Sequence, residues 1–153
     1  NLQPSSRGEV TIVSTDANEA PRIAPNYLAT DDDLAVAVAG LRFTRQIMAA
    51  AALAPFSPRE WKPGVTVESD LQLAQAAREL GTTIFHPVGT CKMGVDSMAV
   101  VDSRLRVYGL QCLRVVDASI MPTLVGGNTN QPATMIGEKG AAMILEDAET
   151  CGG

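Results

Sequence analysis

Two blocks of this sequence contain the residues best suited to chemistry. The first, Ile84–Gly94, contains His86, the only histidine of the chain, so any imidazole chemistry depends on this residue. A neutral imidazole can take a proton from a hydroxyl group, because free histidine titrates near neutral pH. Pro87 and several small residues follow, and small residues let the backbone come close to a ligand. The second block comprises Asp117–Pro122 and Gly126–Pro132.

Each of these residues also has a purely structural interpretation. A lone histidine after two apolar residues is more often structural than catalytic. Asn128 follows Gly127 and suits a turn, because asparagine tolerates left-handed backbone. Asp117 suits a cap at the end of a strand. The run Asp31–Asp33 indicates the N-terminus of a helix, whose positive end it complements, rather than a metal site.

Composition excludes several classes of protein. The chain has 153 residues, enough for one domain with a buried core or for parts of two. A hydrophobic content of 46% with 19% charged residues is typical of a soluble globular protein. The net charge of −5 argues against nucleic-acid binding, and the longest apolar run, Ala49–Ala54, is too short to cross a bilayer. We therefore expect no nucleic-acid partner and no transmembrane segment.

The cysteines bear on the cellular compartment. The chain has three, Cys91, Cys112 and Cys151, without a CxxC pair, which predicts reduced thiols in the cytoplasm. Peripheral membrane association of a longer parent protein stays open. With a single histidine, we expect no metal site. The first residues lack the basic and apolar regions of a signal peptide, and we interpret them as an internal start.

The N-terminal half is expected to contain one strand and two helices. The β-branched run Val10–Ser14 predicts a strand. A helix is expected from Asp31 to shortly before Pro55, because apolar residues recur at helical spacing. The pattern Ser69-Asp70-Leu71-Gln72 is a capping box that opens a second helix, which Gly81 closes.

The C-terminal half is expected to alternate strands and turns before a final helix. Thr82–Phe85 predicts a short strand that leads to His86. Leu105–Tyr108 and Leu113–Val116 predict a hairpin, and the last helix carries Pro132 in its first turn and reaches about Glu146.

The two blocks, taken in order, resemble the C-terminal region of the glucose-methanol-choline (GMC) flavin oxidoreductases. Val101-Asp102 and Leu105-Arg106-Val107 join the blocks, and the resemblance extends from Leu2 to about Asp147. It is densest from His86 to Glu138. The family's G-x-G-x-x-G fingerprint near the N-terminus is absent here, so we expect a C-terminal fragment of a longer enzyme.

The resemblance implies an α/β fold, as a mixed α+β fragment of a two-domain flavoenzyme. Residues 1–81 would belong to the antiparallel-sheet, substrate-binding domain. Residues 82–153 would belong to the Rossmann-like, FAD-binding domain and would carry the active-site residues. The missing N-terminal part of the parent chain would be the partner of this fragment, which we expect to be inactive alone.

The resemblance also implies roles for particular residues. His86 matches the histidine that the family places against the flavin ring, where it would be the general base. Asn128 matches the second active-site position and would hydrogen-bond the alcohol oxygen without taking its proton. Six further residues match positions near FAD: Asp117 and Ala118 near its phosphate and ribitol, and Asn130, Gln131, Pro132 and Ala133 near the pyrimidine end of the flavin.

The implied function is FAD-dependent oxidation of an alcohol to a carbonyl compound, with hydride passing to flavin N5. The sequence does not identify the alcohol, nor whether oxygen or a quinone-like carrier is the electron acceptor. Two alternatives remain. One is a non-catalytic packing or interaction module of the same fold, and the other is a GMC-type hydroxynitrile lyase, whose flavin does no redox work.

The resemblance also bears on the roles of two cysteines. Cys112 lies at a hairpin position where relatives more often carry glycine or asparagine, which questions the geometry of that turn. Cys91 lies where the family often has cysteine or another small residue, so packing is the expected role.

Overall fold

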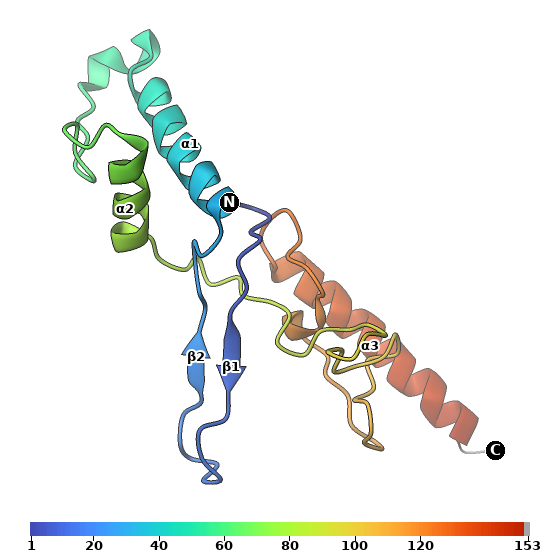
Figure 1. The fold of residues 1–153 in the computed structure, drawn as a ribbon. Helices are drawn as coiled ribbons and strands as arrows, with labels where there is room; N and C mark the ends of the chain where they lie inside the picture. Colours follow the sequence, from blue (N-terminus) through green and yellow to red (C-terminus); the bar gives the residue numbers. More distant parts are fainter. Residues whose placement is uncertain (152–153) are drawn as a thin grey trace. The chain divides into compact units, whose positions relative to one another are not determined.

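The computed structural model describes residues 1–151, with the backbone alone at Thr150 and Cys151 (Figure 1). The chain divides into two units. Unit 1 comprises Asn1 and Gln3–Thr83, and unit 2 comprises Leu2 and the residues from Ile84 onward. The elements in order are β1 (Glu9–Thr11), β2 (Arg22–Ala24), α1 (Asp31–Met48), the 3₁₀ helix η1 (Ala51–Phe56), α2 (Asp70–Leu80), the 3₁₀ helix η2 (Ala118–Ile120) and α3 (Asn130–Cys151).

Unit 1 begins with a two-stranded ribbon (Figure 1). β1 and β2 are antiparallel, and Val10 lies opposite Ile23. The predicted strand at Val10–Ser14 was right in position but too long. The strand ends at Thr11 because the chain then turns, with the Asp16 carboxylate accepting a hydrogen bond from Asn18 N at 2.9 Å.

Helix α1 begins at a threonine cap rather than at the aspartates themselves. Thr30 Oγ1 accepts a hydrogen bond from Asp33 N at 3.3 Å, so Thr30 is the N-cap. The predicted helix continued almost to Pro55, but α1 ends at Met48 and the tighter η1 follows. A proline lacks the N–H that an α-helix interior needs, which explains the change of helix type around Pro55.

Asp33 has a different role from the other two aspartates of its turn. Asp33 is only 3% exposed, and its carboxylate accepts hydrogen bonds from Ser5 N and Ser6 N, both at 2.9 Å. Asn1 Nδ2 donates a third, at 2.7 Å. Hydrogen bonding, chiefly from Ser6, lowers the pKa of Asp33 to about 2. Asp33 therefore ties the N-terminal segment to α1, a role that the prediction of a simple helix complement did not include.

Helix α2 confirms its predicted start. Ser69 Oγ accepts from Gln72 N at 3.3 Å, and Gln72 Oε1 accepts from Ser69 N at 3.1 Å, the two bonds of a capping box. The preceding loop is held by Arg45, whose guanidinium donates to Glu60 Oε2 at 2.9 Å and to Val67 O at 2.9 Å.

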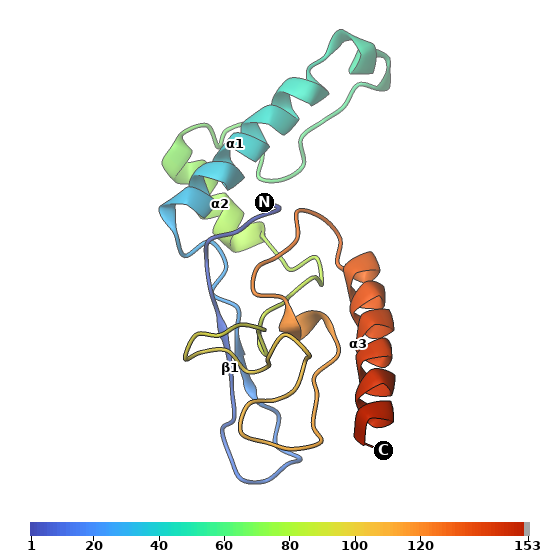
Figure 2. The same cartoon turned by 90° about the vertical axis from the view of Figure 1, so that its right-hand side faces the viewer.

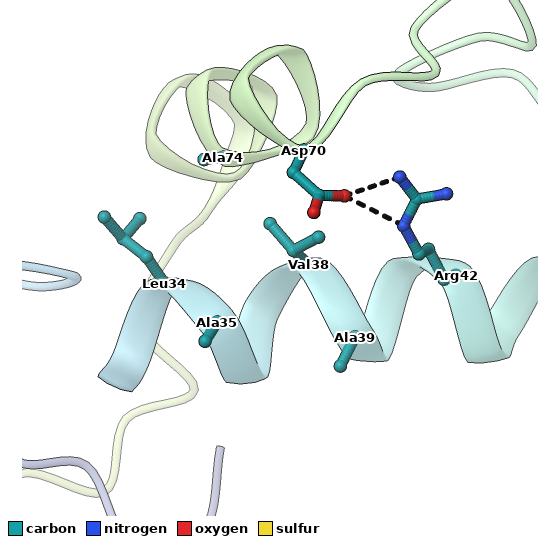
Figure 3. Close-up of a pocket in the computed structure, with 7 residues that line it drawn as sticks. All are labelled: Leu34, Ala35, Val38, Ala39, Arg42, Asp70 and Ala74. Atoms are coloured by element: carbon teal, nitrogen blue, oxygen red, sulfur yellow. Dashed lines mark hydrogen bonds and ion pairs between the residues drawn. The ribbon is translucent and has the colours of Figure 1, made fainter. Parts of the chain in front are cut away.

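The two helices of unit 1 pack through a narrow apolar seam. Val38 of α1 and Leu73 and Ala76 of α2 are its buried residues, with Leu73 at 0% exposed. Beside the seam is a hollow in which Arg42 Nε donates to Asp70 Oδ1 at 3.1 Å (Figure 3). Asp70 is the one carboxylate in the hollow and it is already paired, so we interpret the hollow as a packing seam rather than as a candidate site. Its lining residues are Leu34, Ala35, Val38, Ala39, Arg42, Asp70 and Ala74.

Unit 2 is mostly irregular chain packed beside α3 (Figure 2). Its apolar core comprises the buried residues Val101, Leu105, Ile120, Met121 and Ile136. Gly140 lets α3 come close to this core, because a Cβ there would lie 2.3 Å from Val116 Cγ1. At the far end of the helix, Arg104 and Arg114 both pair with Asp147. Hydrogen bonds from Arg114 and Arg104 lower the pKa of the Asp147 carboxyl.

The strands predicted after Gly81 were only partly right. Thr82–Phe85 forms no strand, because Phe85 lies in the left-handed region with φ 64°. The predicted hairpin is present as a paired turn, with Val107 N donating to Leu113 O at 3.0 Å and a single bridge between Arg106 and Arg114. The final helix, α3, starts before Pro132 as predicted and continues beyond Glu146.

No helix among residues 1–151 has the length and apolar character needed to cross a membrane.

Candidate functional site

His86 is held by one side-chain hydrogen bond. His86 is half-buried, and its Nδ1 lies 2.8 Å from Oγ1 of Thr129, a residue that is 8% exposed. Among the described residues, Nε2 has no hydrogen-bond partner. The left-handed backbone of Phe85 turns the chain immediately before the histidine. One ring nitrogen is therefore occupied and the other is available for chemistry.

The backbone after His86 is tied to the segment around η2. Cys91 N donates to Ser119 O at 3.0 Å, and Met93 N donates to Ile120 O at 2.7 Å. Gly89 has φ 91°, and a Cβ there would lie 3.2 Å from Met121 O. Both features favour glycine at this position. We predicted that small residues here would admit a ligand, but the group that Gly89 approaches is the backbone of Met121.

The polar residues beside this segment are already paired. Lys92 Nζ donates to both carboxylate oxygens of Asp96 at 2.9 Å, and the hydrogen bond from Lys92 lowers the pKa of Asp96. Cys91 is a half-buried free thiol. His86 is therefore the residue of the first block that is equipped for proton transfer.

Asp117 and Ala118 lie at the start of η2. The Asp117 carboxylate accepts a hydrogen bond from Ser119 N at 2.7 Å and caps the short helix. This use of the side chain matches the structural interpretation of Asp117. It leaves the backbone of Asp117 and Ala118 as the part that could approach a cofactor.

The second block ends at the start of α3. Asn128 and Asn130 are exposed, and the buried Thr129 lies between them. Gln131 is also exposed, while Pro132 and Ala133 are half-buried. The first N–H groups of a helix have no acceptor within the helix, so this end of α3 presents free donors beside three exposed amide side chains.

The structure brings the two blocks together through Thr129. Because Thr129 contacts His86, its neighbour Asn128 is one residue away from the partner of the histidine. Thr129 was not predicted from the sequence. A threonine directly before a predicted helix is a typical N-cap, which marks the residue, but its contact with His86 depends on the fold.

Comparison with known proteins identifies relatives along most of the chain. A family model described as GMC oxidoreductase matches residues 4–137. The oxygen-dependent choline dehydrogenase of Pseudomonas syringae pv. syringae (strain B728a) is 49% identical over 144 residues, which cover 94% of this chain and 25% of the relative. The alcohol dehydrogenase [acceptor] of Pseudomonas putida is 44% identical over 149 residues, which cover 97% of this chain and 27% of the relative.

Solved structures show the same similarity. An FAD-dependent oxidoreductase from Chaetomium thermophilum matches with a TM-score of 0.90 and 32% identity, over 97% of this chain and 26% of that one. The chain thus spans about a quarter of the length of the relatives it matches. The resemblance and the mixed α+β fold predicted from the sequence are confirmed.

Proposed function

Because the chain belongs to the GMC oxidoreductase family, we propose that it supplies the proton-transfer residues of an FAD-dependent enzyme that oxidises alcohols to carbonyl compounds. The observation that carries this proposal is the state of His86. The only histidine of the chain is half-buried, bound at Nδ1 by a buried hydroxyl, and unbound at Nε2 among residues 1–151. A general base needs this combination of a fixed ring and a free lone pair.

His86 removes the hydroxyl proton of the alcohol at Nε2. As the O–H bond breaks, the oxygen becomes more negative, which helps the neighbouring carbon to release its hydrogen as a hydride. The proton stays on the imidazole, and the C–O bond becomes a carbonyl. Acid–base assistance of this kind contributes about 10²- to 10⁴-fold to a rate.

Asn128 orients the alcohol. An amide can donate a hydrogen bond to the oxygen but has no useful basicity, so proton acceptance remains with His86. The side chain of Asn128 is exposed and follows Gly127, where it has room to meet a substrate. A well-placed donor to a developing oxyanion is worth about 10²- to 10³-fold in rate.

Two segments of the chain have backbone groups that suit contact with FAD. The backbone of Asp117 and Ala118 would lie near its phosphate and ribitol, and the start of α3 at residues 130–133 would meet the pyrimidine end of the flavin. Free N–H groups and the positive end of a helix dipole suit a group that gains negative charge. When bound, FAD supplies the hydride acceptor.

The partners and location of the protein follow from the same proposal. The substrate is a small alcohol, and the remaining cofactor contacts come from the rest of a GMC-type chain. We assign residues 1–81 to the substrate-binding part and residues 82–153 to the FAD-binding part. The two reduced cysteines among the described residues suit a cytoplasmic protein, and cell fractionation would test that location.

Rapid mixing of the full-length flavoprotein with alcohols under anaerobic conditions tests this proposal. Choline and simple primary alcohols are suitable probes, because the relatives are named for such reactions. We expect loss of the oxidised-flavin absorbance, slowed about 10²-fold or more in His86→Ala. Asn128→Ala should slow it about 10- to 1000-fold, and Asn128→His should retain more activity.

Two controls make the result interpretable. Met135→Ala, at an exposed position of α3, should leave the rate of flavin reduction unchanged. Asn130→Ala tests the assignment of Asn128, because a larger loss in Asn130→Ala would move the role two residues along the chain. Flavin reduction at wild-type speed in His86→Ala would exclude the proposed base. Cleavage of a cyanohydrin without flavin reduction would instead indicate a lyase.

A further inference from the structure

Thr129 occupies the N-cap position of α3. Its carbonyl oxygen accepts the hydrogen bond of Ala133 N at 2.9 Å, and α3 begins at the next residue, Asn130. The side chain of an N-cap threonine normally accepts a hydrogen bond from the N–H of the second or third helical residue. At only 8% exposed, Thr129 has little access to water as an alternative partner.

The helix sequence removes one of the two usual hydrogen-bond donors to this hydroxyl. The third helical residue is Pro132, which has no N–H to offer. Thr129 Oγ1 instead lies 2.8 Å from His86 Nδ1, a distance typical of a good hydrogen bond. Pro132, in the first turn of α3, thus removes one competing donor for the hydroxyl that contacts the histidine.

We infer that Thr129 is a positioning residue for His86, which it holds as the Nδ1–H tautomer with the Nε2 lone pair exposed. This inference rests on the proposed role of His86 as base. A neutral imidazole carries one proton, and a base acting at Nε2 must carry it on Nδ1. The hydroxyl oxygen of Thr129 then accepts from Nδ1–H.

The hydrogen bond between Thr129 Oγ1 and His86 Nδ1 can form in both protonation states of the imidazole. After His86 takes the substrate proton at Nε2, Nδ1 still carries its hydrogen, so the bond to Thr129 Oγ1 persists. It also strengthens, because hydrogen bonds from a charged donor are stronger than neutral ones. Proton transfer therefore requires no reorientation of the imidazole, and the ring is ready for the next turnover.

Two variants of Thr129 separate the hydroxyl from the shape of the side chain. Thr129→Val keeps the branched shape and removes the acceptor, whereas Thr129→Ser keeps the hydroxyl. Thr134→Val is the matched control, because Thr134 lies on the same helix and its hydroxyl donates to Asn130 O at 3.0 Å. In the full-length flavoprotein we expect Thr129→Val to slow flavin reduction about 10- to 100-fold at saturating alcohol. Thr129→Ser should restore most of the rate, and Thr134→Val should change it little.

Nitrogen NMR of the full-length protein labelled with ¹⁵N-histidine reads the tautomer directly. The His86 signals are assigned by their loss in His86→Asn. In the wild type and in Thr129→Ser, Nδ1 should have the shift of a protonated nitrogen and Nε2 that of an unprotonated one. In Thr129→Val the two shifts should move toward each other, as the tautomers mix.

The combined outcomes distinguish this inference from the proposed function. An unchanged tautomer and a wild-type rate in Thr129→Val, alongside a crippled His86→Ala, would overturn the role of Thr129 alone. An equal slowing in Thr134→Val would also overturn it, by indicating a general effect on α3. A wild-type rate in His86→Ala would overturn the proposed function, whatever the tautomer of His86.

Discussion

Unit 1 and unit 2 of this protein are stabilised in different ways. Unit 1 contains β1, β2, α1 and α2, yet few of its side chains are fully buried, and charged groups such as Asp33 and Arg45 tie its segments together. Unit 2 is irregular up to α3, yet it contains the larger apolar core and the candidate site. Regular secondary structure and a well-packed core are therefore separate properties. In this chain the candidate site lies in the unit with the larger apolar core.

The difference has a structural reason. An irregular chain can bring backbone from distant positions close to one point, as Gly89 does at Met121. A helix pair such as α1 and α2 presents only side chains to its neighbour. Backbone contacts of this kind tie the segment after His86 to the segment around η2.

The largest effect is expected where unit 1 depends on a buried charge. Asp33→Ala removes the buried acceptor of the hydrogen bonds from Asn1, Ser5 and Ser6. The free energy of unfolding should fall by about 3 kcal/mol. Urea unfolding followed by circular dichroism measures it, and Asp31→Asn, at an exposed position in the same turn, is the control.

The same residue predicts a dependence on pH. The pKa of Asp33 is lowered from 3.8 to about 2, so the unfolded chain takes up this proton at a higher pH than the folded chain does. Asp33 therefore stabilises the fold above about pH 4, by about 2 kcal/mol, and this contribution is lost as the pH falls through 2. Asp33→Asn should abolish this part of the acid sensitivity. An unchanged acid transition in Asp33→Asn would mean that unit 1 does not rely on this charge.

An intermediate effect is expected where unit 2 depends on close packing. In Gly140→Ala the new methyl would lie 2.3 Å from Val116 Cγ1 and 3.4 Å from Leu105 Cδ1, so α3 must move away from the core. Overpacking should outweigh the gain in helix propensity and destabilise unit 2 by about 1 to 2 kcal/mol. Hydrogen exchange of peptides from α3, measured by mass spectrometry, reports this change locally.

Gly137→Ala is the matched control on the same helix. A Cβ at Gly137 meets nothing within 4 Å, so this variant should gain up to about 1 kcal/mol from helix propensity. Equal protection of α3 in the two variants would show that unit 2 does not need the close approach at Gly140.

The smallest effect is expected at the turn of unit 2. Cys112 has φ 58°, which costs an ordinary residue about 1 kcal/mol or more. Cys112→Gly should stabilise this turn by about 0.5 kcal/mol, because glycine removes the strain but gains freedom in the unfolded chain. Cys112→Ser keeps the strain and removes the thiol, so it should leave the stability unchanged. A loss of stability in Cys112→Gly, measured by the same exchange experiment, would contradict this account.

The sequence predicted local features best. The capping box at Ser69 and the helix around Pro132 depend on neighbours in the chain, and both were found at their expected positions. The strand predicted before His86 was wrong, because Thr82–Phe85 has strand-like residue types but Phe85 adopts left-handed backbone, with φ 64°. The turn whose geometry Cys112 called into question is formed, and Cys112 adopts the left-handed backbone that suits glycine, with φ 58°.

The site was predictable as residue types but not as contacts. His86 could be selected from the sequence because it is the only histidine of the chain. Its partner Thr129 could not, because a hydrogen bond between distant residues depends on the folded path of the segment between them. The same limit applies to Asp33, whose three donors lie far from it in the sequence.

The hydrogen bond between His86 and Thr129 has a consequence for biosynthesis. The two residues are 43 positions apart, and the segment between them contains Val101, Leu105 and most of the apolar core of unit 2. Closing such a loop costs conformational entropy, which the burial of that core offsets. During translation, the imidazole therefore obtains its fixed orientation only after the start of α3 has left the ribosome. A partly made chain carries the histidine without the geometry that would make it reactive.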